Sequence, residues 1–577
     1  MKHNLHLALA FLFCTTLSAR AAAVSTAILG QSQNNTVSYI QTSDTSAVAD
    51  LFTAEQLAAY KGAKITQVSV DMNGASDHLR VFVASSLTGE PLASQLSTSK
   101  GEGWQTITFD EPYTITGEPV YIGYEVEGIR SLRYSQALMP GREWQRRRSA
   151  GWEEYENDYR ASFYATVEGD GVPTSNALIF STTLPHYVET GHEMEFTATL
   201  SNLGSTSISS ATFDVLVDGT AVATETVSGL SIAKRRKGSL TFSAGTIATE
   251  GTHELALALT HVNGVADTDL YANQTEAVSA TCRSEFTPRK VLMEVYSTEK
   301  CTACPAAHER IEQSLGKETN IIEVCHHSGF LTDQLTVDES QTYEWFFGTN
   351  KYAPAVMFDR TAYVNDLPDA FYQGVPPVEP KTTSLLTSLH KLSKATPALA
   401  SVDLNTTYDE QSRRLTVSVC GSQLLPVEGM ENICLNVFLT EDSIFSTTQT
   451  SSNKSFWHRH ALRQVLTDTW GESYELSSAD VMTYETTLDD SWDASRMAVV
   501  AFIANYDGSD KTNCRVLNAA QCPVVNDPTG IAGVSDGAEA AKVIGRYNAA
   551  GMPIAQPQSG LNIIRKSNGE TIKVILP

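Results

Sequence analysis

The chain has 577 residues, of which 42% are hydrophobic and 19% charged, a composition typical of globular proteins rather than of disordered or membrane-embedded ones. At roughly 150 residues per domain, this length predicts about four domains. With 41 basic and 66 acidic residues, the net charge is −25, which repels phosphate backbones and anionic membrane surfaces. We therefore expect no nucleic-acid partner.

The first 21 residues have the organisation of a secretory signal peptide. Lys2 stands at the start, an apolar run covers residues 5–17, and small residues stand at Ala19 and Ala21, where a signal peptidase selects its site. This run is too short to span a bilayer as a helix, and no later stretch approaches the roughly 20 apolar residues that a span needs. We expect an exported protein whose mature chain has no membrane-spanning segment.

Short alternating strands separated by Gly, Pro and Asn turns dominate most of the chain. Over 22–168 this pattern predicts a jelly-roll-like β-sandwich, and over 169–283 it predicts an immunoglobulin-like β-sandwich. Strand patterns return over 399–525, where we predict a further β-sandwich that contains a short helix near 460–466. The sequence therefore predicts a mainly β protein.

The pattern changes over 284–398, where buried strands alternate with helical segments. We expect an apolar strand over 291–296, a CxxC pair at Cys301 and Cys304, and a helix over 306–315. A second apolar strand over 321–325 follows, and later Pro354 stands before a third strand. Near-continuous apolar strands are typical of parallel sheets that are covered on both faces. This order is that of a thioredoxin-like α/β domain.

Cys301 and Cys304 are the only cysteines at CxxC spacing. Unpaired N–H groups at a helix start favour a thiolate, and Lys300 adds a positive charge. We predict that Cys301 attacks a client disulfide and that Cys304 resolves the mixed disulfide. In thioredoxin-like folds a cis-proline faces this pair, and we assign Pro354 to that place. Glu294, in the strand before the pair, is predicted to be the acid that shuttles protons.

Two other interpretations of the CxxC pair stay open. The first is a static disulfide, and the second is a metal site that adds His308, four residues after Cys304, and the pair His326–His327. A c-type haem site is excluded because Pro305 stands where the haem ligand would directly follow the second cysteine. We predict neither a metal nor a cofactor.

Nine cysteines less Cys14 in the signal and less the CxxC pair leave six others. An even number in an exported protein favours disulfides. Cys420 and Cys434 lie in neighbouring strand-like runs, and Cys514 and Cys522 are close in the sequence, so each pair is a candidate local disulfide. The sequence leaves the pairing of these cysteines open. The two not yet mentioned are Cys282 and Cys325.

Several segments of the second half together resemble the 28-kilodalton outer-membrane-protein-related family. They are 294–298, 301–308, 327–329, 352–360, 458–463, 498–502 and 516–519. The resemblance covers about 285–525 and implies a thioredoxin-like domain followed by a β-sandwich, in proteins of the cell surface. Lys300 departs from thioredoxins proper, which carry Trp before the first cysteine.

The last part of the chain, 542–577, is predicted to be a small all-β unit that follows a linker rich in Ala, Gly and Pro at 526–541. Its glycine-containing hairpins and its final Lys-Val-Ile run are similar to the C-terminal sorting domain of type IX secretion cargo. This resemblance implies that the outer-membrane secretion machinery is a partner.

These features predict a multi-domain, mainly β protein with one α/β thioredoxin-like domain, exported to the cell surface or outer membrane or secreted. Its predicted activity is thiol–disulfide exchange through Cys301 and Cys304, with protein thiols or disulfides as partners. The alternative is a non-enzymatic surface adhesion or assembly protein in which the thioredoxin-like unit is only a scaffold. The two differ in whether the pair can be reduced and reoxidised without unfolding.

We predict that the mature protein begins at Ala22, or within two residues of it, because Ala19 and Ala21 satisfy the small-residue rule of signal peptidase. Cleavage removes Lys2 and Arg20, which changes the net charge from 41 − 66 to 39 − 66, or −27. Mass analysis or Edman sequencing of the exported protein measures this. An intact N-terminus on the exported protein would contradict the prediction.

Overall fold

The computed structural model describes most of the chain. It covers residues 25–525 apart from 35–37, 42–44, 128–130, 148–149, 156–158, 171, 364–373, 428, 451–454 and 479, and residues 543–576 apart from 549–553, 555, 557–559 and 567–570. The predicted signal peptide at 1–21 and the predicted linker at 526–541 lie outside the described residues. The chain divides between Pro288 and Arg289 into two compact units. Strand makes up 53% and helix 9%, which confirms the mainly β prediction.

The first unit begins with two β-sheets that share one hydrophobic core. The larger has the order β1 (Ser25–Leu29), β11 (Phe163–Gly169), β4 (Lys64–Ala84), β6 (Val120–Val126), β3 (Thr45–Phe52), β8 (Arg142–Arg147) and β9 (Trp152–Tyr155), with β5 (Ala93–Thr114) on β4. The smaller has the order β10 (Tyr159–Ala161), β7 (Ser131–Gln136) and β2 (Ser38–Gln41). The short helices after β3 are α1 (Ala54–Leu57) and η1 (Ala58–Tyr60).

A second β-sandwich follows in the same unit, where the sequence predicts one. One sheet has the order β12 (Ala177–Thr183), β14 (Met194–Asn202) and β17 (Lys237–Ala244). The other has the order β13 (Tyr187–Glu189), β20 (Val278–Arg283), β18 (Gly251–Val262), β15 (Ile208–Val217) and β16 (Thr220–Ile232), with β19 (Val265–Ala266) on β18. Phe213 and Val215 of β15 point into the core, and Asp214 between them does not, as a period of two requires.

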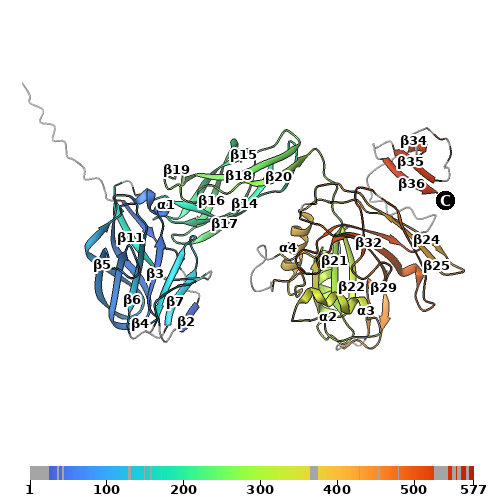
Figure 1. Ribbon diagram of the computed structural model, residues 1–577, viewed down its shortest axis with the longest axis horizontal. Helices are drawn as coiled ribbons and strands as arrows, with labels where there is room; N and C mark the ends of the chain where they lie inside the picture. The colour runs from blue at the N-terminus through green and yellow to red at the C-terminus, as the bar shows by residue number, and fades with distance from the viewer. Residues whose placement is uncertain are drawn as a thin grey trace, which may run out of the picture. The chain divides into compact units, whose positions relative to one another are not determined.

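The second unit is built around one mixed sheet (Figure 1). Its order is β23 (Ala355–Phe358), β21 (Val291–Ser297), β22 (Ile321–His327), β29 (Ala461–Val465), β26 (Ile433–Glu441), β32 (Met497–Asn505) and β33 (Val516–Pro523), with β30 (Glu472–Ser473) on β26. β21 is parallel to β22 and antiparallel to β23. Smaller sheets pair β24 (Asp403–Asp409), β25 (Arg414–Cys420) and β31 (Met482–Thr487), and β27 (Ile444–Ser446) with β28 (Phe456–His458).

The strand β21 is covered on both faces, which explains its continuous apolar sequence. On one face Val291, Met293 and Val295 pack against α2 (Cys304–Leu315) and α4 (Thr383–Lys394). On the other face, Leu292 and Tyr296 share a core with the aromatic side chains of η2 (Tyr343–Phe347), which directly follows α3 (Asp338–Thr342). Figure 1 shows α2 and α4 beside β21 and β22. The short η4 (Ala494–Arg496) precedes β32.

The helix predicted near 460–466 is instead the strand β29. Ala461 pairs with Cys325 of β22, and Val465 pairs with Phe438 of β26. Both neighbours leave an open edge that only an extended segment can fill, and this pairing overrides the local sequence preference. As a consequence, the predicted domains 284–398 and 399–525 share one sheet and one compact unit.

The six cysteines outside the CxxC pair that the structure describes are not joined to one another by disulfides, which corrects the two candidate local disulfides. Cys420 ends β25 in a small sheet, whereas Cys434 lies in β26 of the large sheet, so these strands are not paired. Cys514 precedes β33 and has its sulfur 3.6 Å from the Asp507 carbonyl oxygen, whereas Cys522 lies within β33. Closeness in the sequence therefore did not bring either pair of cysteines together in a disulfide.

The C-terminal residues form the small all-β unit that the sequence predicts. Its strands are β34 (Val543–Asn548), β35 (Gly560–Lys566) and β36 (Thr571–Leu576), which pair antiparallel in that order.

Among the helices that the structure describes anywhere in the chain, none has the length and apolar character needed to cross a membrane.

Candidate functional site

Cys301 and Cys304 are joined by a disulfide at the end of β21, where the chain turns into α2. Cys304 is the first residue of α2, and Cys301 lies in the preceding loop, where its backbone N–H donates to the Thr298 carbonyl oxygen. The two residues are only 4% and 1% exposed. Both cysteines are therefore almost inaccessible in the disulfide form, and Cys301 is the more exposed of the two.

Pro354 follows a cis peptide bond with Ala353, as the sequence predicts. The antiparallel pairing of β21 with β23 brings this segment to the end of β21 that carries the cysteine loop, with Tyr296 opposite Ala355. The Cys301 sulfur lies 3.5 Å from the Ala353 carbonyl oxygen. Cys301 and the segment before Pro354 are thus in direct contact.

Glu294 does not lie under the CxxC helix. Its side chain is on the face of β21 opposite α2, because it alternates with Met293 and Val295. Nε and Nη2 of Arg360 each donate to its carboxylate at 2.9 Å, and both side chains are fully buried. Burial alone would raise the pKa of Glu294, but the Arg360 charge and hydrogen bonds outweigh it and lower the pKa to about 2. The geometry does not support a proton-shuttle role, since Glu294 lies on the face of β21 away from α2 and is held by Arg360.

The loop around Cys301 is covered by the segment 446–450, which the sequence did not indicate as part of the site. Gln449, itself buried, donates through Nε2 to the Cys301 carbonyl oxygen at 2.9 Å. The Thr450 N–H donates to the Glu299 carbonyl oxygen at 2.7 Å, and Ser446 donates to the Glu299 carboxylate. These contacts explain why a cysteine before a helix start is almost inaccessible.

A buried group of polar side chains lies on the same side of the loop. Asp333 accepts hydrogen bonds from His327 Nδ1 at 2.8 Å and from the Glu299 N–H at 2.7 Å, which ties the loop to the end of β22. Burial and the nearby His327 lower the pKa of His458 to about 4, so His458 is neutral at neutral pH. The His327 and His458 rings are 4.8 Å apart, and no described atom hydrogen-bonds the His458 nitrogens. Only the fold brings these residues together.

The residues of the metal interpretation have other partners. His308 Nε2 lies 3.0 Å from Ser297 Oγ, and His326 Nε2 donates to Glu294 while its Nδ1 lies 3.2 Å from Ser340 Oγ. Cys304 is in the disulfide. Across the part of the chain that the structure describes, no group of three or more His, Cys, Asp or Glu side chains is placed to hold a metal ion.

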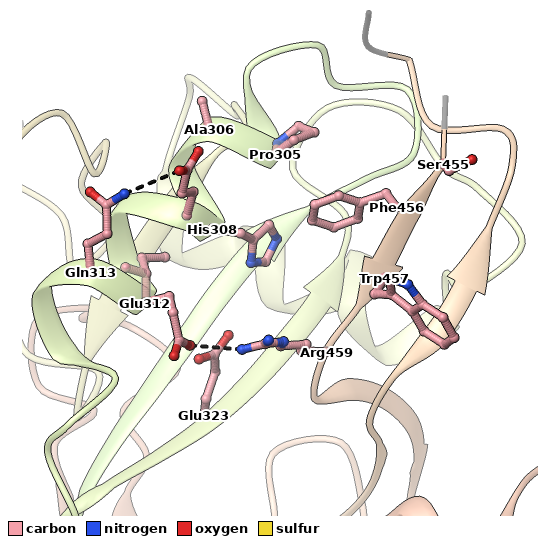
Figure 2. Close-up of a pocket in the computed structure, with 12 residues that line it drawn as sticks. Pro305, Ala306, His308, Glu312, Gln313, Glu323, Ser455, Phe456, Trp457 and Arg459 are labelled. Atoms are coloured by element: carbon pink, nitrogen blue, oxygen red, sulfur yellow. Dashed lines mark hydrogen bonds and ion pairs between the residues drawn. The ribbon is translucent and has the colours of Figure 1, made fainter. Parts of the chain in front are cut away.

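A pocket of about 700 Å³ opens beside the CxxC helix, between α2 and the β27–β28 hairpin (Figure 2). Pro305 and Ala306, directly after Cys304, form one end of its lining, and Phe456 and Trp457 form the opposite wall. The remaining lining residues are His308, Glu309, Ile311, Glu312, Gln313, Glu323, Ser455 and Arg459. Sequence reasoning missed this pocket because its two walls are about 150 residues apart in the chain.

Two family models match parts of the chain. Residues 378–526 match the Outer membrane protein Omp28 family, and residues 175–277 match CARDB. The Omp28 match begins after the CxxC pair, so it confirms only the second part of the predicted resemblance over 285–525. The CARDB match coincides with the second sandwich of the first unit. No curated protein matches the chain.

Several solved structures are similar to parts of this chain. HBP35 of Porphyromonas gingivalis is 16% identical, with a TM-score of 0.35, over 50% of this chain and 99% of its own. The CARDB domain of PF1109 from Pyrococcus furiosus, in complex with di-metal ions, is 20% identical, with a TM-score of 0.15, over 18% of this chain and 87% of its own. A domain of a putative cell surface protein from Methanosarcina acetivorans is 23% identical, with a TM-score of 0.16, over 19% of this chain and 93% of its own.

The family matches define the class of this protein. It is an exported protein of the cell surface or outer membrane, with a β-sandwich in its first unit that matches the CARDB model and a region in its second unit that matches the Omp28 model.

We predict that removing one partner of the Glu294–Arg360 pair destabilises the second unit more than removing both. Glu294→Met or Arg360→Met leaves a buried charge unpaired, which costs about 3–5 kcal/mol, whereas the double variant has no such charge. Because the pKa of Glu294 is lowered to about 2, the stabilisation is complete above the ordinary glutamate pKa and is lost as the pH falls toward 2. Urea unfolding at several pH values measures both effects.

The matched control is Glu485→Met, which removes the carboxylate of an ion pair with Arg414 whose two side chains are half exposed. It should change the free energy of unfolding by less than about 1 kcal/mol. If the double variant is as unstable as the worse single variant, the pair is not the source of the effect.

Proposed function

We propose that this cell-surface protein exchanges disulfides with client proteins through Cys301 and Cys304, in a subdomain of thioredoxin-like architecture. The observation that carries the proposal is the disulfide between the loop after β21 and the first residue of α2, with the Cys301 sulfur against the Ala353 carbonyl that precedes cis-Pro354. The parallel β21–α2–β22 unit with the antiparallel strand β23 supports the thioredoxin-like assignment.

The oxidised pair accepts two electrons from a client dithiol. A client thiolate attacks the Cys301 sulfur, the Cys301–Cys304 bond breaks, and the electron pair leaves on Cys304. The second client thiolate then attacks the client sulfur of the mixed disulfide and releases Cys301. The client has formed a disulfide, and the protein holds two thiols. The same steps in reverse reduce a client disulfide at the expense of the protein dithiol.

A second candidate function is surface adhesion or assembly, in which the disulfide is structural. The CARDB match favours it, as does the segment 446–450 that covers Cys301. The two candidates differ in one property. An exchanging pair must react with small thiols while the rest of the unit stays folded, whereas a structural pair reacts only on unfolding.

We predict that mild reduction of the folded protein opens this pair and that alkylation then labels Cys301 before Cys304, since Cys301 is the more exposed residue. Cys301→Ser should abolish exchange with model dithiols and disulfides, and Cys304→Ser should accumulate mixed disulfides. Peptide mapping by mass spectrometry measures both. Cys420→Ser, which changes a free cysteine in β25, is the control and should behave as the wild type.

Two results would contradict disulfide exchange and favour the structural role. One is a pair that is reduced only together with unfolding, and the other is earlier labelling of Cys304.

We further propose that the C-terminal unit directs the protein across the outer membrane through the secretion machinery. Its strands β34, β35 and β36 pair with one another in a sheet of their own, which supports a separate role.

Deleting Lys542–Pro577 should leave the melting temperature and the disulfide chemistry of the remainder nearly unchanged, because β34, β35 and β36 pair only with one another and every other described sheet keeps all of its strands. The truncated protein should accumulate in the periplasm, as measured by fractionation and surface labelling. Surface display of the truncated protein, or its unfolding, would contradict the sorting role.

A further inference from the structure

We propose that the pocket between α2 and the β27–β28 hairpin binds a lysine or arginine side chain of a client polypeptide beside its reacting cysteine. The inference rests on the proposed disulfide exchange, since it names the class of client that the site prefers. It is argued from the shape, the charge and the position of the pocket.

The pocket is acidic. Glu309, Glu312 and Glu323 line it, and Arg459 is the only cation among its described lining residues. Arg459 Nη1 forms an ion pair with Glu312 at 2.8 Å, which neutralises one carboxylate. Burial lowers the pKa of His308 to about 3, with neighbouring positive charges adding to the effect, so this imidazole contributes no charge at neutral pH. The described lining therefore holds three carboxyl groups and one cation.

Glu323 is the carboxylate that lacks a partner. It projects from β22 into the pocket, close to the Glu312–Arg459 pair (Figure 2). Within the described residues it has no hydrogen-bond or ion-pair partner, whereas Glu309 accepts from Gln313 Nε2 at 3.2 Å. Burial raises the pKa of Glu323, although the nearby His460 and Arg459 oppose this shift, so its charged form is poorly solvated. A ligand cation would relieve this cost.

The walls suit the aliphatic part and the head of a basic side chain. Phe456 and Trp457 form one wall of the pocket, so a flexible apolar stem can pack along their rings. The faces of aromatic rings also attract ammonium and guanidinium groups. Trp457 is 52% exposed although it is a large apolar residue, and its neighbour Phe445, 4.9 Å away between ring centroids, is 51% exposed. An acidic or neutral polar side chain would gain neither the attraction to the carboxylates nor the cation–π contact.

The pocket is placed to act on the same client as the disulfide. Pro305 and Ala306 at its edge follow Cys304 directly, so a chain bound at Cys301 needs only a few residues to reach the pocket. The hairpin that provides the aromatic wall also leads from Ser446 into the segment that covers Cys301. Recognition and exchange therefore share one structural element.

The test uses the full mature protein and short capped peptides that carry one cysteine between two positions occupied by Lys, Gln or Glu. Fluorescence anisotropy with Cys→Ser versions of the peptides measures binding without any exchange. For exchange, the peptide cysteine is supplied as a mixed disulfide with a small thiol; Cys301 of the Cys304→Ser protein attacks the peptide sulfur, the small thiol leaves, and the trapped protein–peptide disulfide is measured. The Lys peptide should bind about fivefold more tightly than the Gln peptide, and the Glu peptide should bind weakest. Higher ionic strength should reduce the difference.

Glu323→Gln should remove most of the preference for Lys, and Trp457→Ala should weaken binding of the Lys peptide without affecting folding, since this side chain is half exposed. The matched control is Glu410→Gln, which neutralises an exposed glutamate in the turn between β24 and β25 and should leave the preference intact. Equal binding of the three peptides, or a preference that survives Glu323→Gln, overturns the proposal. Selective binding of the Lys peptide without exchange would support the binding role of the pocket and contradict the proposed disulfide exchange.

Discussion

Backbone pairing through β29 is the constraint on which the architecture of the second unit depends. Without this strand, the β21–β22 pair and the β26–β32–β33 sheet would each expose an unpaired edge. The Cys325 N–H donates to the His460 carbonyl oxygen, and the pairing of Val465 with Phe438 continues the sheet on the other side. The α/β half and the β half of the unit thus form one hydrogen-bonded layer.

Two buried ion pairs support this continuous sheet. Glu294 of β21 holds Arg360, whose guanidinium lies over the rings of Phe346 and Phe502, the latter in β32. Arg289, just before β21, pairs with Asp359 at 3.2 Å, and the Asp359 carbonyl oxygen accepts from the Val516 N–H of β33. The residues that follow β23 therefore link the two halves of the sheet. Because the charges are fully buried, the pairs specify one arrangement more strongly than they stabilise it.

The joined sheet also determines the surroundings of the CxxC pair. The β27–β28 hairpin and the segment after β27 come from the β half, yet they cover the Cys301 loop and form a wall of the adjacent pocket. Access to Cys301 is therefore a property of the whole unit.

The sequence by itself determined the elements whose chemistry is local. The strand 291–296, the strand 321–325, the helix after the CxxC pair and the cis form at Pro354 follow from apolar runs, cysteine spacing and a proline before a strand, and the structure confirms them. The strands of the first unit likewise follow from the alternation of apolar and polar residues along the sequence. Only the tertiary structure decided the role of 461–465, the face on which Glu294 lies and the burial of Cys301. Residues 461–465 form a strand because of their backbone partners, and Glu294 is paired with Arg360, which is 66 residues away. Cys301 is buried by a segment about 150 residues away. No local sequence pattern encodes which distant segment will make these contacts.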